Sequence, residues 1–91
     1  MVEHLEIKIY GKVQGVSFRY FASQKALDLA IFGFVRNETD GTVYIEVEGK
    51  EEDLKNFLEW CRKGPETAQV EKVDFAFSEK MKKFDEFIAV P

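Results

Sequence analysis

The residues from Gly11 to Arg19, with the sequence GKVQGVSFR, combine glycines and an arginine in a way that suits anion binding. The segment follows a strand-like alternation and precedes a helix-like pattern, so we expect the chain to turn at Gly15. Backbone amides in such a turn point towards one spot, beside the positive end of the helix dipole. Arg19 lies in the first helical turn and adds a guanidinium. Converging amides and one guanidinium indicate a site for a tetrahedral anion such as phosphate.

Other phosphate motifs do not match this segment. It lacks the Lys-Ser/Thr ending of a P-loop, and its glycines do not follow the GxGxxG spacing. On the residue pattern alone, an ordinary strand-to-helix turn with a surface arginine is the alternative. Ser17 precedes the helical pattern and is interpreted as its N-cap or as a hydrogen-bonding group for a ligand, rather than as a nucleophile.

Composition restricts the remaining chemistry. The only cysteine, Cys61, excludes an intramolecular disulfide, and the only histidine, His4, is predicted to be a surface residue with no catalytic role. We therefore expect no metal site and no cofactor. The net charge of −4 argues against a nucleic-acid partner. No signal peptide or membrane-length apolar run is present, so a cytoplasmic protein is expected.

The 91 residues are predicted to form one domain, residues 1–91. Apolar periodicity predicts helices at 18–29 and 51–63, strands at 4–12, 31–38, 42–48 and 70–78, and a short fifth strand within 84–90. The Asp-Gly pair at 40–41 predicts a hairpin between the second and third strands. The apolar stripe of the first helix is assigned to the core, and it consists of Phe18, Phe21, Ala22, Ala26 and Leu29.

The order β-α-β-β-α-β is that of the split βαβ, ferredoxin-like α+β sandwich, with an antiparallel sheet and both helices on one face. In this arrangement the first two strands run in the same direction with the third between them. Their C-terminal ends then meet at one edge of the sheet. The Gln14–Arg19 loop follows one strand and Asn37 follows the other, so we expect a neutral amide side chain to face the anion site.

Two motifs in this order resemble the signatures of the acylphosphatase family. GKVQGVSFR, at 11–19, is similar to the first; GFVRN, at 33–37, followed by Asp40-Gly41, is similar to the second. Gly64-Pro65 and the AQV segment at 68–70 resemble later landmarks. The sequence departs from the family at Ala30, where glycine is usual, and at Phe34, where tryptophan is frequent.

The resemblance implies hydrolysis of acyl phosphates to a carboxylate and inorganic phosphate. Inorganic phosphate is also expected to inhibit the reaction by competing with the substrate. It implies that Asn37 holds the attacking water and that Arg19 binds the phosphoryl group, without a metal or a covalent phosphoenzyme. The backbone amides implied in phosphate binding belong to Gln14, Gly15, Val16, Ser17, Phe18 and Arg19.

Three other functions fit parts of the sequence. One is a phosphate-binding or regulatory module without turnover, and a second is a domain that handles carbamoyl phosphate. The third is an RNA-binding domain with Tyr10 and Tyr44 as exposed sheet aromatics, although the acidic balance and Glu46 and Glu48 oppose it.

Overall fold

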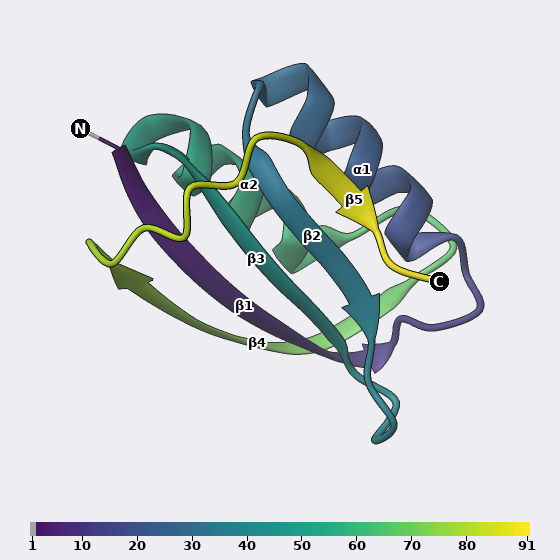
Figure 1. The fold of residues 1–91 in the computed structure, drawn as a ribbon. Helices are drawn as coiled ribbons and strands as arrows, with labels where there is room; N and C mark the ends of the chain where they lie inside the picture. Colours follow the sequence, from purple (N-terminus) through teal and green to yellow (C-terminus); the bar gives the residue numbers. More distant parts are fainter. Residues whose placement is uncertain (1) are drawn as a thin grey trace.

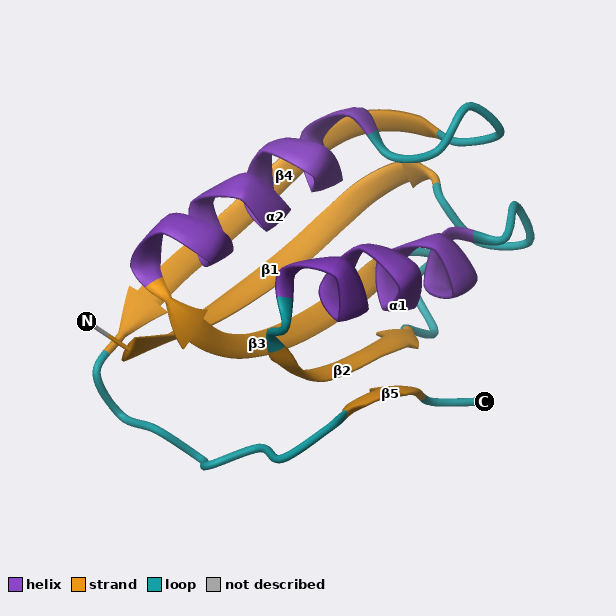
Figure 2. Ribbon diagram, turned by 90° about the horizontal axis from the view of Figure 1, so that it is seen from above, coloured by secondary structure: helices purple, strands orange, loops and turns teal. Residues whose placement is uncertain are grey.

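Seven elements make up the computed structural model, which describes residues 2–91. The helices are α1 (Phe18–Leu29) and α2 (Glu51–Lys63). The strands are β1 (Val2–Lys12), β2 (Phe32–Asn37), β3 (Val43–Lys50), β4 (Gln69–Ser78) and β5 (Phe87–Ala89). Both helices cover the same face of one sheet, as Figures 1 and 2 show. The predicted α+β sandwich is therefore confirmed.

The sheet has the strand order β4-β1-β3-β2-β5. Both β1 and β2 run antiparallel to β3, which lies between them, so their C-terminal ends share one edge of the sheet. The predicted short fifth strand is present, and it pairs parallel to β2. The sheet is thus antiparallel over four strands and mixed at its edge.

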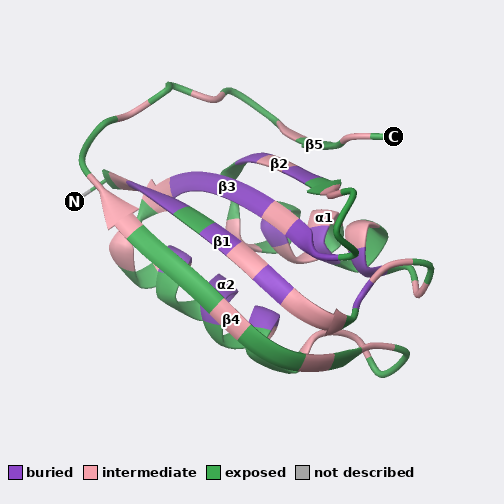
Figure 3. Cartoon of the chain, turned by 90° about the horizontal axis from the view of Figure 1, so that it is seen from below, coloured by how far each residue is buried: buried purple, intermediate pink, exposed green. Residues whose placement is uncertain are grey.

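Alternation along β1 and β3 builds the core between the sheet and the helices. The core-facing side chains of these two strands are fully buried, and they are Leu5, Ile7, Ile9, Val43, Ile45 and Val47. From α2, four buried side chains complete this layer, and they are Leu54, Phe57, Leu58 and Cys61. Figure 3 shows the buried residues concentrated in the central strands, whereas β4 at the edge is mostly exposed.

The predicted core stripe of α1 is partly wrong. Phe18, Ala22 and Ala26 are buried, but Phe21 is 41% exposed. At 100° per residue, Phe21 lies about 100° around the helix from the centre of the buried line, beyond the reach of the sheet. It borders instead a hollow of about 470 Å³ between the helices, opposite Trp60.

Two backbone positions test expectations about glycine. A Cβ at Gly33 would lie 1.8 Å from the carbonyl oxygen of Glu46, so this close backbone approach requires glycine. Ala30 ends α1 in the left-handed region, with φ of 54°, and its amide donates to Leu27 at 3.1 Å. The usual cap geometry therefore forms without a glycine.

The segment between β4 and β5, residues 79–86, passes over the start of β1 on the face that the helices leave open (Figure 1). It buries His4, which is only 3% exposed, so the predicted surface position of this histidine is wrong. The strand alternation placed His4 on the outer face, but nothing local indicated that a distant segment would cover it. Within residues 2–91, neither helix has the length and apolar character needed to cross a membrane.

Candidate active site

The loop between β1 and α1 contains two left-handed residues. Gly15 has a φ of 70°, and Ser17 has φ and ψ of 62° and 23°. Alternating left-handed and other conformations turn successive amides inward and form an anion-binding concavity. Ser17 occupies the N-cap position, but its side chain makes no capping hydrogen bond, so that part of its interpretation is wrong. Its contribution is the backbone turn.

The amides of this loop are available to a ligand. The first amides of α1 have no acceptor within the helix. Among the turn and loop hydrogen bonds of residues 2–91, none is donated by the main chain of residues 14–19. A bound anion would therefore satisfy several otherwise free donors.

Two side chains hold the loop in place, and the sequence reasoning missed both. Gln14 donates from Nε2 to the carbonyls of Glu38 (2.7 Å) and Thr42 (2.8 Å), which ties the loop to the β2–β3 turn. The Thr67 hydroxyl donates to the Val16 carbonyl at 2.6 Å. The motif identified Gln14 only through its backbone amide, and no sequence pattern marks the carbonyls that its side chain reaches.

Arg19 lies on the first turn of α1, and its Nη1 donates a hydrogen bond to the main-chain carbonyl of Val90. Val90 is in turn held by its own amide, which donates to the Val35 carbonyl of β2 at 2.8 Å. The C-terminal segment thus positions the guanidinium. No sequence pattern marks Val90, because the contact depends on the parallel docking of β5.

Asn37 ends β2 and pairs with Val43 of β3. Its side-chain oxygen, Oδ1, is buried and has no hydrogen-bond partner among residues 2–91. Buried amide oxygens are nearly always satisfied, so an unpaired one calls for a further donor such as a water molecule.

One open pocket of about 560 Å³ brings these groups together at the edge of the sheet. Its lining includes Gly15, Ser17, Arg19 and Asn37. The predicted meeting of the loop with Asn37 is therefore observed. The hollow between the helices differs, because its lining comes from the helix faces and from residues 65–67, and it contains none of the loop residues 14–19.

The surroundings of two titratable side chains, Cys61 in the core and Asp40 near the site, shift their pKa values. Burial raises the pKa of the Cys61 thiol, which keeps it protonated and unreactive. Asp40, in the turn that Gln14 braces, accepts hydrogen bonds from the Thr42 hydroxyl and amide, and Lys8 lies 3.0 Å away. These contacts lower the pKa of Asp40 to about 2.

Known proteins resemble this chain over almost its whole length. The family described as Acylphosphatase matches residues 5–89. An acylphosphatase of a Nocardioides species is 49% identical over 70 residues, which cover 77% of this chain and 71% of that one. An acylphosphatase of Salinibacter ruber is 41% identical, covering 93% and 90%. The crystal structure of acylphosphatase from Bacillus subtilis superposes over 100% of both chains, with a TM-score of 0.95 and 33% identity. On this evidence the chain belongs to the acylphosphatase family.

Proposed function

We propose that this protein hydrolyses acyl phosphates by direct attack of a water molecule that Asn37 holds. The supporting observation is the pocket in which the left-handed loop, the Arg19 guanidinium and the unpaired Asn37 oxygen meet. The amides of residues 14–19 and Arg19 would bind the phosphoryl oxygens. Asn37 Oδ1 would accept a hydrogen bond from the water and direct its lone pair at phosphorus.

The reaction balances without a further group. The water oxygen forms a bond to phosphorus, the bond between phosphorus and the acyl oxygen breaks, and its electron pair leaves with the carboxylate. The proton of the water passes to a phosphate oxygen or to solvent. A carboxylate is a good leaving group, so positioning and charge stabilisation carry the reaction. We therefore propose that it needs no metal and forms no phosphoenzyme. Inorganic phosphate would compete for the same amides, and the cytoplasmic location remains a prediction.

A passive phosphate-binding module, or one that handles carbamoyl phosphate, would use the same loop. The passive module requires no water-directing group, whereas the unpaired Asn37 oxygen supports hydrolysis, and the carbamoyl-phosphate domain would be a narrower case of it. RNA binding is less well supported. The Tyr44 hydroxyl, on the outer face of the sheet, lies 2.8 Å from a Glu6 oxygen and 2.7 Å from a Glu46 oxygen, and it donates its one proton to either of them. Carboxylates therefore surround the aromatic surface.

The test is the release of inorganic phosphate from a small aliphatic acyl phosphate, an aromatic acyl phosphate and carbamoyl phosphate, beside a phosphate monoester. We expect turnover of the mixed anhydrides and none of the monoester, whose leaving group is far poorer. Binding of phosphate without turnover of any anhydride would favour the passive phosphate-binding module. Turnover of carbamoyl phosphate alone would favour a domain that handles only carbamoyl phosphate. Retention on an RNA column at moderate salt would favour the nucleic-acid alternative.

A further inference from the structure

Four ionisable residues form a block on the outer face of the sheet, at the start of β1 and the end of β3. His4 lies opposite Glu48, and Glu6 lies opposite Glu46. Because alternate residues of a strand share a face, all four side chains project on the same side. His4, Glu46 and Glu48 are each no more than 5% exposed, whereas Glu6 is exposed. Three carboxylates therefore surround one buried imidazole.

The His4 ring is oriented by Glu48. Nδ1 of His4 lies 2.6 Å from Oε2 of Glu48, and an ionised carboxylate can only accept, so Nδ1 carries the proton. Glu48 is itself held by the amides of Lys82 (2.6 Å) and Phe84 (3.1 Å). When one nitrogen of a histidine binds a metal, the other usually donates a hydrogen bond to a carboxylate, as Nδ1 does here. It leaves Nε2 pointing towards the other two carboxylates.

The group that faces Nε2 is a buried carboxylate oxygen, Oε1 of Glu46, whose contacts are ion pairs. Oε1 of Glu46 receives no well-aligned hydrogen bond from residues 2–91. Two nitrogens lie near it, Nε2 of His4 at 3.1 Å and Nζ of Lys82 at 2.9 Å. Glu46 is thus in contact with the ammonium of Lys82.

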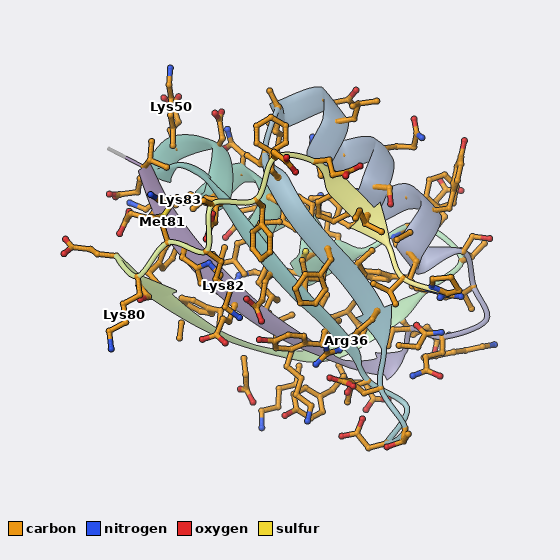
Figure 4. The ribbon with its side chains drawn as sticks, viewed as in Figure 1. Arg36, Lys50, Lys80, Met81, Lys82 and Lys83 are labelled. Carbon is orange, nitrogen blue, oxygen red and sulfur yellow. The ribbon has the colours of Figure 1, made fainter. Side chains whose placement is uncertain are left out.

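The ammonium of Lys82 reaches Glu46 from an exposed position. Its side chain is 58% exposed, although the oxygen that it meets is buried. In Figure 4, Lys82 is directed over the outer face of the sheet, whereas Lys80 projects away from it. An ammonium on a long, exposed stem can move into solvent and leave its place to a metal ion.

We propose that His4, Glu6 and Glu46 bind a divalent transition-metal ion of the Zn²⁺ class, in competition with the ammonium of Lys82. One ligand atom from each residue lies within 4.8 Å of the other two, close enough for rotamer changes to bring them to roughly 2.0–2.2 Å from a shared ion. An imidazole with two carboxylates suits Zn²⁺, Co²⁺ or Ni²⁺, whereas Mg²⁺ and Ca²⁺ prefer oxygen ligands alone.

This site is separate from the proposed active site. His4 lies near one end of β1, and the Gln14–Arg19 loop follows the other end, at Lys12. Eight residues of strand separate His4 from Lys12, about 27 Å at 3.4 Å per residue. A metal held there would join β1 to β3 and take no part in hydrolysis, so it can be tested independently of the proposed function.

The test is titration of the metal-free protein with Zn²⁺ by calorimetry, and with Co²⁺ by visible absorption, which reports coordination by nitrogen and oxygen. We expect one equivalent to bind. Glu6→Gln and His4→Gln should each weaken Zn²⁺ binding by at least about tenfold, since mutation of residues that only support the ligands of a metal site already lowers the affinity that much. Glu6 is exposed, so its substitution should not disturb folding. Lys82→Gln should tighten Zn²⁺ binding by about thirtyfold, the effect of removing one unit charge ~4 Å from a divalent ion in water-like surroundings.

Lys80→Gln is the matched control, because it removes the same charge from a lysine that points away, and it should leave the affinity unchanged. Failure of the parent protein to bind one equivalent of Zn²⁺ would overturn the proposal, as would equal affinities in the parent and Glu6→Gln. His4 would then serve only to link Glu46 and Glu48 across the outer face of the sheet. If His4→Gln does not fold, the Zn²⁺ affinities of Glu6→Gln, Lys82→Gln and Lys80→Gln still test the proposal.

Discussion

Arg19 and Val90, separated by 71 positions in the chain, are joined by a hydrogen bond from the guanidinium Nη1 to the main-chain carbonyl. Arg19 belongs to the first helix and Val90 follows the last strand, so the placement of the guanidinium depends on the docking of the chain's last segment. Five predictions test the site and its surroundings.

Deletion of residues 90 and 91 should lower kcat/KM while the protein remains folded. The deletion removes the acceptor that positions Arg19, and a hydrogen bond from a charged group contributes about 1.5–3 kcal/mol, roughly a tenfold loss or more. Val90→Ala is the control, because it keeps the carbonyl and should keep the activity. Equal activity in the deletion variant, the control and the parent would show that Arg19 needs no such support.

Arg19→Lys should be nearly as damaging as Arg19→Ala. Lysine keeps the charge but loses the planar pair of donors that matches two phosphate oxygens. The loss should be on the order of 2–4 kcal/mol of transition-state stabilisation, as for other donors in a site of this kind. Steady-state kinetics and phosphate inhibition measure it, and near-parental turnover in the lysine variant would assign Arg19 a surface role only.

Asn37→Ala should separate chemistry from binding. If Asn37 directs the attacking water, its removal should lower kcat by about a hundredfold and leave the affinity for inorganic phosphate close to that of the parent. Folding should be preserved, because its side-chain oxygen has no partner within residues 2–91. The measurements are kcat, phosphate affinity and a melting curve. An unchanged kcat would remove Asn37 from the mechanism, and a much lower melting temperature would make it a structural turn residue.

Chelation should leave the hydrolysis rate unchanged. The proposed phosphate site consists of amides and Arg19, and the only group of metal-ligating side chains found within residues 2–91 lies at the other end of β1. The assay is the rate before and after treatment with EDTA, with added Mg²⁺ as the control. A rate that falls on chelation and returns with Mg²⁺ would contradict the proposed mechanism.

Asp40 should contribute to acid stability over a defined range. Hydrogen bonds from Thr42, and then Lys8, lower its pKa in the folded protein from 3.8 to about 2. A lowered folded-state pKa stabilises the protein above the unfolded pKa, and this contribution is lost as the pH falls from about 4 towards 2. Urea unfolding of the parent and of Asp40→Asn should therefore give stabilities that differ above pH 4 and converge near pH 2. A difference in unfolding free energy between the parent and Asp40→Asn that does not change with pH would contradict this contribution of Asp40.

The sequence was most informative where the structure depends on local periodicity. The bounds of α1 and α2 were predicted correctly, because the 3.6-residue pattern acts within a few positions. The meeting of the Gly15 loop with Asn37 was also predicted, since it follows from strand order alone.

The missed features depend on contacts between distant segments. The burial of His4 and the contact of Val90 with Arg19 both require the path of residues 79–91, which carry little periodicity. The exposure of Phe21 depends on the spacing of the helices, which a helical stripe does not encode. The role of the Gln14 side chain required knowing which carbonyls of the β2–β3 turn would face it.

The short strand β5 also has a consequence for the solution behaviour of the protein. The amide of Gly33 donates to Glu86 at 2.9 Å, and the carbonyl of Val35 accepts from Val90 at 2.8 Å, so residues 86–90 occupy the outer edge of β2. An unpaired strand edge is a template on which another molecule can add a strand. By covering it, the same few residues that support Arg19 protect the folded monomer from aggregation through edge-to-edge pairing.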